Sequence, residues 1–458
     1  MCAVSEPTPL GAPAVYFLTL GCPKNEVDTD RMKAAVLGSA FEVAEDPDAA
    51  DVVVVNTCSF IQEATEESIQ TILDVSRSWL PAREGRKLVV AGCMPSRYGA
   101  DLAESMPEVD AFLPVTEEDA LLDVLERLAG VPAHPGAGSR GTDATTACLP
   151  RTPSGPSAYL QVSDGCHMRC SYCTIPAIRG PYRSRPLDEI VEEAELLVAT
   201  GAREIVLIGQ DISSYGRDLA PAPGAAHAPA LADVVRAVAR VDGLAWLRLM
   251  YVQPEGVTPE LLEVIAEEPS VCHYLDMPLQ HASASVLRRM RRRGSAAEFL
   301  RLIKHIRDVV PDVVLRTSLI AGFPGETPDD VRQLEHFLEA ARLDYAGVFP
   351  YSPEDGTPAA TMPGLPTKRT RLRRAQRIRD LADRIGFDRA AERIGESLDV
   401  LVEGVEDDGV TVGRWRGQAP EVDGVVLFAE ESRVRPGDIV TARVVDSLGY
   451  DLEVEVIS

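Results

Sequence analysis

The sequence predicts a multidomain α/β protein with three parts: an open parallel α/β sheet, a partial (β/α)6 barrel, and a small antiparallel β-barrel. Two observations predict the first two parts: buried apolar strands alternate with helical patterns, and this occurs in one series of three and a second series of six. Beyond about Ile394 the helical pattern stops, and short β segments separated by turn signals follow. A length of 458 residues fits about three domains.

Hydropathy, cysteine content and net charge limit the kinds of protein that this chain can be. No apolar run reaches the length of a membrane span, and residues 1–13 lack a signal-peptide pattern, so we expect a cytoplasmic protein that does not bind membranes. Nine cysteines without a secretion signal indicate reduced thiols that bind metal or react. A net charge of -25 disfavours RNA binding and favours a basic partner, although a well-solvated acidic surface is the plainer alternative.

In the first part, a cysteine follows each of three predicted strands. The strands are expected at residues 15–20, 52–55 and 88–91. Cys22, Cys58 and Cys93 come just after their ends. Because the carboxyl ends of parallel strands share one edge of a sheet, we expect the three cysteines to converge there. The alternative is three independent buried cysteines that act as small hydrophobic residues.

A second group of three cysteines lies on one short loop. Cys166, Cys170 and Cys173 follow a predicted strand at residues 158–162. Three thiolates on one loop indicate a soft-metal or iron–sulfur site with one open coordination position. Cys148, in a Pro/Gly/Ser/Thr-rich linker, is the alternative fourth ligand that would close the site. The GxGxxG in that linker, residues 136–141, lacks a preceding strand and is rejected as a nucleotide site.

The remaining strands of the second part are expected at residues 204–208, 246–250, 273–277, 313–320 and 345–349. Helices are expected between them at residues 188–200, 231–241, 285–310 and 329–342. Six repeats are fewer than the eight of a closed barrel, so the barrel should be open. After the fifth strand, Gly322, Pro324 and Gly325 form a turn whose exposed amides are expected to bind an amino acid or ribose group. Basic runs at residues 288–293 and 368–379 fall on predicted helices. Runs of this kind usually form solvated or salt-bridged helix faces.

The third part is acidic. From Glu392 onward there are 16 Asp and Glu against 6 Arg, a balance of -10. Small barrels of this kind often bind single-stranded RNA or a protein loop. The charge disfavours RNA and favours a basic protein.

Several segments resemble those of a known family, the methylthiotransferases among the radical S-adenosylmethionine (SAM) enzymes. The resemblance covers the chain from about Val15 to Ser458, including the order of a cysteine-bearing α/β domain, a radical SAM partial barrel and a TRAM barrel. It rests on segments that look like family signatures, at residues 164–176, 179–186, 276–281 and 322–327. The segments at residues 20–25 and 56–61 resemble the RimO branch. His167-Met168 departs from the common pattern at positions that are not ligands in the family.

The resemblance implies the domain boundaries and the cofactors. It implies a methylthiotransferase N-terminal domain at 14–130, a linker at 131–151, a radical SAM core at 152–389 and a TRAM domain at 392–458. Cys166, Cys170 and Cys173 would hold one [4Fe-4S] cluster, with SAM on its open iron. Cys22, Cys58 and Cys93 would hold an auxiliary [4Fe-4S] cluster. Gln210, Gly322, Pro324 and Gly325 are the expected SAM contacts, and beyond the two clusters no catalytic residue is singled out.

The resemblance to the RimO branch also implies the function. The chain would add a methylthio group to the β-carbon of an aspartate in small-subunit ribosomal protein S-twelve, using SAM for the radical and for the methyl group. It would take electrons from a low-potential donor such as flavodoxin or ferredoxin. The nearest alternative is a methylthiotransferase that acts on a tRNA adenosine. An alternative of another class is a non-catalytic, metal-bound scaffold that docks on ribosomes.

Overall fold

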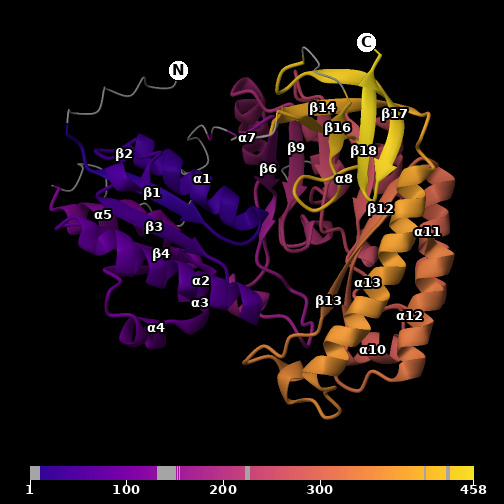
Figure 1. Ribbon diagram of the computed structural model, residues 1–458, viewed down its shortest axis with the longest axis horizontal. Coiled ribbons are helices and arrows are strands. Elements are labelled where there is room, and N and C mark those ends of the chain that lie inside the picture. Colours follow the sequence, from indigo (N-terminus) through magenta and orange to yellow (C-terminus); the bar gives the residue numbers. More distant parts are fainter. Residues whose placement is uncertain are drawn as a thin grey trace. The chain divides into compact units, whose positions relative to one another are not determined.

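The computed structural model describes residues 11–131, 151, 153, 155–221, 227–406, 409–429 and 434–457, in two compact units (Figure 1). Of the described residues, the first unit contains those up to residue 151 together with residues 164–167 and 173–182. The second contains the described residues among 153–163, 168–172 and 183–457. Cys148, the GxGxxG at 136–141 and most of the predicted linker lie outside the described residues.

The first unit is built on a five-stranded parallel sheet with the order β2-β1-β3-β4-β5. The strands are β1 (Ala14–Thr19), β2 (Glu42–Val43), β3 (Val52–Thr57), β4 (Lys87–Gly92) and β5 (Ala111–Pro114). The helices are α1 (Pro23–Leu37), α2 (Gln62–Asp74), α3 (Cys93–Tyr98), α4 (Ala100–Ser105) and α5 (Leu121–Ala129). The three predicted strands are confirmed as its centre, while the edge strands β2 and β5 were not predicted.

The β-branched run of β3 explains why this sheet is covered on both faces. Val52 and Val54 belong to one apolar cluster, whereas Val53 and Val55 belong to another. A strand that is buried on both sides needs apolar residues at every position rather than at every second one. Helix α2, which follows β3, ends its α-helical part at Asp74, and the chain continues as a π-helical turn, Val75–Trp79.

The second unit contains a six-stranded sheet in which every neighbouring pair is parallel and the strands follow their sequence order. The strands are β6 (Ser157–Gln161), β9 (Glu204–Ile208), β10 (Trp246–Leu249), β11 (Val271–Asp276), β12 (Val314–Ala321) and β13 (Tyr345–Pro350). Its helices include α7 (Leu187–Ala199), α8 (Leu231–Ala239), α9 (Pro259–Glu267), α12 (Pro328–Ala341) and α13 (Lys368–Ala391). The short strands β7 (Ser163–Asp164) and β8 (Arg183–Ser184) flank the loop with the cysteine triplet, which also contains α6 (Ile175–Ile178). The predicted partial barrel is confirmed.

The single helix predicted at residues 285–310 is wrong, because the structure has two helices there. They are α10 (Ala284–Arg289) and α11 (Ala296–Val309). Between them, Arg291 and Gly294 have positive φ angles of 57° and 115°. A Cβ atom on Gly294 would lie 2.3 Å from the Phe299 ring, so the backbone must approach that ring closely. Part of the basic run at 288–293 therefore lies in a turn.

The C-terminal segment forms a closed five-stranded barrel with the order β14-β15-β16-β18-β17. The strands are β14 (Ser397–Val405), β15 (Thr411–Trp415), β16 (Val426–Phe428), β17 (Ile439–Leu448) and β18 (Asp451–Val456). The small barrel is confirmed, with one difference: β16 and β18 pair in parallel, whereas the other pairs are antiparallel. The barrel is therefore closed by one parallel pair of strands in addition to the antiparallel pairs.

Buried ion pairs connect this small barrel to the six-stranded sheet. Glu204, the first residue of β9, binds Arg248 of β10 at 2.7 Å and also binds Arg414 of β15. Arg316 binds Asp276 at 2.9 Å and Asp423 of the small barrel at 3.3 Å. Since both sets of charges are out of water, each arginine depends on its carboxylate partner.

Within the described ranges, no helix has both the length and the apolar character needed to cross a membrane.

Candidate functional site

The first candidate site lies along the carboxyl edge of the five-stranded sheet. Cys22 precedes α1 directly, after β1, and Cys58 follows β3. Cys93 is the first residue of α3, after β4. Cys58 and Cys93 are buried, while Cys22 is half-buried. The structure thus places the three sequence-predicted cysteines at adjacent strand ends.

Two glycines allow the strand ends to approach closely. Gly21 has φ 105°, and a Cβ atom there would lie 2.5 Å from Cβ and 3.1 Å from Sγ of Cys58. Gly92 has φ 95°, and a Cβ atom there would lie 2.2 Å from Oδ1 of Asn56. Any side chain at either position would push one cysteine-bearing loop away from its neighbour.

A buried amide pair fixes the loops relative to each other. Asn25 donates to Oδ1 of Asn56 at 3.1 Å and to the carbonyl of Thr57 at 3.0 Å. Asn56 donates in return to the carbonyl of Asn25 at 2.9 Å. The Cys22 thiol donates to Oδ1 of Asn25 at 3.3 Å. The sequence showed both asparagines in family-like segments, but their mutual contact depends on residues 31 positions apart and was missed.

Burial raises the pKa of two thiols at this edge, those of Cys58 and Cys93. Burial raises the pKa of Cys93 to about 12, although nearby Arg179 acts in the opposite direction. Burial also raises the pKa of Cys58, and the neighbouring Cys22 adds to the effect. A bound metal centre supplies the positive charge that converts such thiols to thiolates. Three soft donors of this kind fit an iron–sulfur cluster.

A buried arginine stands beside these cysteines. Nη2 of Arg179 binds Oδ2 of Asp28 at 2.6 Å and lies 3.9 Å from Sγ of Cys93, while Nη1 is 3.4 Å from Oδ1 of Asp164. Burial and the charge of Asp28 raise the pKa of nearby Glu118 well above its ordinary range. The sequence marked Arg179 as part of a signature segment, but no local signal indicated its pairing with Asp28, which is 151 residues away.

The second candidate site is the loop with Cys166, Cys170 and Cys173, all half-buried. The N–H of Cys166 donates to the carbonyl of Gly180 at 3.3 Å. Gly165, with φ 69°, would place a Cβ atom 2.2 Å from the carbonyl oxygen of Pro181, so this close approach needs glycine.

Ser171 anchors the middle of this loop within the second unit. Its N–H donates to the carbonyl of Met290 at 3.1 Å, and its hydroxyl donates to the carbonyl of Arg289 at 2.7 Å. Its own carbonyl accepts from the N–H of Ala359 at 2.8 Å. The buried Arg292 forms a side-chain hydrogen bond with Cys170. These supports were not visible in the sequence.

The cysteines of the described residues divide into these two groups of three, plus Cys272, which is buried on β11. No three or more His, Cys, Asp or Glu side chains in the described part of the chain are gathered around one metal ion. A four-iron cluster is larger than a single ion, so its three thiolates stand farther apart than the ligands of a mononuclear site. The donor chemistry of both groups fits such a cluster.

The residues predicted to contact SAM lie at the carboxyl ends of the six-stranded sheet. Gln210 follows β9, and its Oε1 is buried without a hydrogen-bond partner in the described structure. Gly322, Pro324 and Gly325 follow β12. The prediction that the amides of this turn are exposed is wrong for the two glycines. The N–H of Gly322 donates to Glu326 within the turn at 2.8 Å, and the N–H of Gly325 donates to the carbonyl of Gly364, in the segment before α13, at 2.9 Å.

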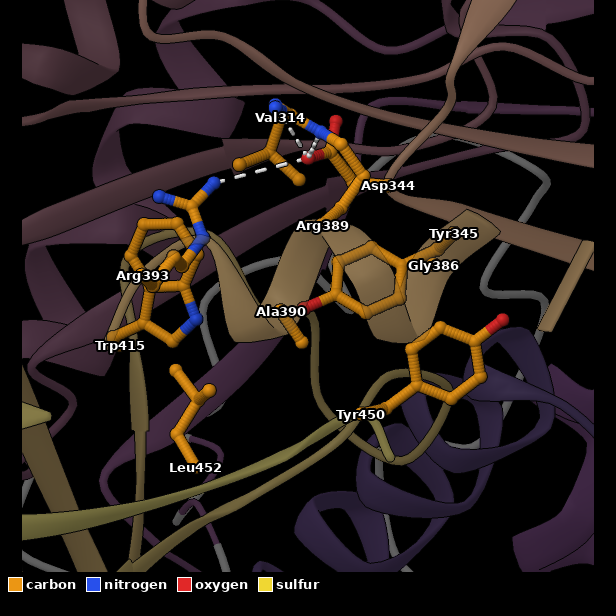
Figure 2. A pocket seen from close by; sticks show the side chains of 10 residues that line it. All are labelled: Val314, Asp344, Tyr345, Gly386, Arg389, Ala390, Arg393, Trp415, Tyr450 and Leu452. Carbon is orange, nitrogen blue, oxygen red and sulfur yellow. Dashed lines mark hydrogen bonds and ion pairs between the residues drawn. The ribbon is translucent and has the colours of Figure 1, made fainter. Parts of the chain in front are cut away.

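A cavity lies away from these strand-end motifs, beside the small barrel (Figure 2). It measures about 260 Å³ with its open mouth. Figure 2 shows Asp344 paired with Arg389 and Arg393, above Trp415 and Tyr450 in this view. The cavity lies at the starts of β12 and β13, next to α13. Its lining includes none of the cysteines or predicted SAM contacts at the carboxyl ends of the strands. It is therefore a junction between elements of the second unit and not the candidate active site.

Three family models match the chain in succession. Residues 14–114 match the Uncharacterized protein family UPF0004, residues 160–338 match the Radical SAM superfamily, and residues 394–457 match the TRAM domain. Curated relatives match nearly the full length. The protein named "Ribosomal protein uS12 methylthiotransferase RimO" from Geobacter sulfurreducens is 43% identical over 448 residues, covering 97% of this chain and 98% of the relative. The protein of the same name from Geotalea uraniireducens is 42% identical, with the same coverage.

The chain belongs to the RimO family of radical SAM methylthiotransferases. The predicted family and branch are therefore confirmed, as is the prediction of a transferase. Members of this family use SAM and two [4Fe-4S] clusters, in agreement with the two groups of three cysteines.

Solved structures support the fold at much lower identity. TsrM from Kitasatospora setae, a radical SAM methyltransferase solved with cobalamin and a [4Fe-4S] cluster, aligns with a TM-score of 0.54 at 15% identity. The match covers 85% of this chain and 77% of TsrM. The cobalamin-dependent radical SAM enzyme OxsB aligns with a TM-score of 0.51 at 14% identity, covering 81% of this chain and 57% of OxsB. At these identities the likeness concerns the fold alone.

Proposed function

We propose that this protein adds a methylthio group to the β-carbon of an aspartate in ribosomal protein uS12. The observation that carries the proposal is full-length similarity to RimO proteins in a chain with two separate groups of three cysteines. The acidic C-terminal segment supports a basic protein substrate, because ribosomal proteins are generally basic. We place this activity in the cytoplasm, with electrons supplied by a low-potential carrier such as flavodoxin or ferredoxin.

The six cysteines are the proposed cluster ligands. Cys166, Cys170 and Cys173 would hold the cluster that binds SAM, and the three strand-end cysteines of the first unit would hold the auxiliary one. When bound, the clusters and SAM supply the radical, sulfur and methyl chemistry that amino-acid side chains cannot provide. The protein's own part is to orient these groups and to exclude water.

Residues around the cysteines have supporting roles in this proposal. The hydrogen bond between Asn25 and Asn56 holds together the loops that carry Cys22 and Cys58. Ser171 fixes the middle of the triplet loop. The buried guanidinium of Arg179 offers N–H groups and positive charge beside Cys93, where thiolate charge would develop. Gln210 offers a buried amide oxygen at a strand end as a SAM contact.

Mass spectrometry of the substrate tests the proposed function. In a strain that lacks the gene, intact uS12 should lose the mass of one methylthio group, whereas thiomethylated adenosine in tRNA should be unchanged. Restoring the gene should restore the mass. Unchanged uS12 with loss of the tRNA modification would instead support the tRNA substrate, and tightly bound zinc without SAM cleavage would support the scaffold.

The two cluster assignments can be tested separately by substitution. Cys58→Ala should remove the auxiliary cluster, about half of the iron of a protein with two four-iron clusters, and leave reductive SAM cleavage. Cys272→Ala is the matched control, because that thiol is buried on β11 and belongs to neither group. It should retain both clusters. Loss of the SAM-cleaving cluster in Cys148→Ala would show that the triplet site is closed by a fourth cysteine, contrary to the proposal.

A further inference from the structure

Two short segments of the second unit concentrate positive charge in an otherwise acidic chain. Residues 288–293 contain five arginines and no acidic residue, and residues 368–379 contain seven cations and no acidic residue. The whole chain has a net charge of -25. Such segments are often neutralised within the protein by ion pairs.

Half of these cations are exposed and lack an ion pair with any described residue. They are the six residues that we call the basic rim: Arg288, Arg291, Arg293, Lys368, Arg369 and Arg373. Arg377, by contrast, pairs with Glu335, and Arg374 pairs with Glu326. The side chains of the basic rim therefore place positive charge on the surface, where a partner molecule can bind it.

The two segments of the rim belong to one neighbourhood. Arg289 donates to the carbonyl of Gly325 at 2.9 Å, and the N–H of Gly325 donates to the carbonyl of Gly364, four residues before α13 begins. Arg374 donates to the carbonyl of Glu326 at 2.9 Å. Figure 1 shows α10 and the beginning of α13 at the same end of the second unit. The loop after β12 thus connects both segments.

The same neighbourhood supports the cysteine triplet. Met290 and Arg289 accept the two hydrogen bonds donated by Ser171, the residue that follows Cys170. Arg292 lies in the same run, is buried and bonds to Cys170. Exposed Arg291 is thus the chain neighbour of two residues that contact the triplet loop. Few covalent and hydrogen bonds separate this surface from a cluster ligand.

Two exposed leucines accompany the rim cations. Leu365 is 38% exposed just before α13, and Leu372 is 50% exposed on its first turns. Protein interfaces commonly combine an apolar contact with a charged surround. Single-stranded RNA is usually bound on aromatic side chains, and neither residues 288–293 nor residues 368–379 contain one.

We propose that the basic rim is the docking surface for an acidic, low-potential one-electron carrier protein that reduces the cluster held by Cys166, Cys170 and Cys173. This inference rests on the proposed function, since it assumes a cluster at the triplet. One electron leaves the reduced flavin or iron–sulfur centre of the carrier and enters that cluster, and no atom is transferred. Positive charge also repels a basic substrate, so substrate and electron carrier would use surfaces of opposite sign.

The test compares two reductants in the reconstituted full-length protein. The variant Arg288→Gln/Arg291→Gln/Arg293→Gln removes three rim charges and keeps Arg289 and Arg292, which hold the triplet loop. Reduced bacterial flavodoxin is the probe protein, and dithionite is a small reductant that needs no docking surface. With flavodoxin, the concentration for half-maximal SAM cleavage should rise about tenfold, and its dependence on salt should become weaker.

The matched control is Arg301→Gln/Arg384→Gln/Arg443→Gln. These arginines are exposed, have no ion pair among the described residues, and lie outside the rim. The control changes net charge by the same amount, so it should leave the flavodoxin dependence within about twofold. An equal loss in both triple variants would show that only total charge matters and would overturn the proposal.

The remaining outcomes separate this inference from the proposed function. If the parent protein cleaves no SAM even with dithionite, the proposed function fails. If it cleaves SAM with dithionite and the rim variant keeps the flavodoxin dependence of the parent, only the docking surface is refuted. If the rim variant loses affinity for a ribosomal RNA fragment while flavodoxin dependence is unchanged, the surface binds nucleic acid instead and the inference is overturned.

Discussion

Arginines at the two ends of the six-stranded sheet have opposite surroundings. At the amino ends, Arg248 and Arg414 are buried and share the carboxylate of Glu204. At the carboxyl ends, Arg288 and Arg291 are exposed and form no ion pair with described residues. A buried guanidinium without a partner is costly, whereas an exposed one is stabilised by water. The first group therefore holds two domains together, and the second is available for binding.

Removal of the shared carboxylate should have the largest effect on stability. In Glu204→Gln, two buried arginines lose their common counter-charge, and unfolding should be easier by about 3–5 kcal/mol. Denaturant unfolding measured by circular dichroism, together with limited proteolysis between the sheet and the small barrel, checks this. The control is Glu268→Gln, whose partner Arg240 is 65% exposed. It should cost less than about 1 kcal/mol. Equal losses in both variants would contradict the contrast between buried and exposed ion pairs.

Acid should reduce the stability that Glu204 provides through Arg248 and Arg414, and it should do so within a defined pH range. Burial alone would raise the pKa of Glu204, but Arg414 and Arg248 together lower it from 4.5 to about 2. A depressed folded-state pKa gives stability that is complete above the unfolded value and is lost as pH falls toward the folded value. The parent protein should therefore lose its stability advantage over Glu204→Gln between about pH 4.5 and 2. A constant difference across this range, measured by denaturant unfolding, would refute it.

The features predicted from sequence are those that depend on local pattern. The β-branched run of residues 52–55 marked a strand buried on both faces, and each cysteine of the first group followed such a strand directly. Strand β2 has two residues, too few for a periodic pattern. The break near Gly294 was missed because its cause, contact with the Phe299 ring, lies in packing rather than in composition.

Contacts between distant positions of the chain could not be predicted. Arg179 and Asp28 form a buried pair across 151 residues, and Glu204 and Arg414 form one across 210. In the sequence, a lone arginine such as Arg248 looks no different from a solvated one, while a basic run suggests a salt-bridged face. The structure reverses this for the sheet, since the lone arginines are paired, whereas half of the cations in the runs are exposed and form no ion pair with described residues.

The smallest effect on stability is expected at the carboxyl end. Arg291→Gln removes a guanidinium that is exposed and has no ion pair among the described residues, so the free energy of unfolding should change by less than about 0.5 kcal/mol. Its φ of 57° belongs to the turn, and glutamine has the same backbone preferences as arginine, so the turn should persist. Denaturant unfolding beside Glu204→Gln gives the comparison directly. A loss above about 1 kcal/mol would mean that Arg291 has a structural partner after all, and that the two ends of the sheet are alike.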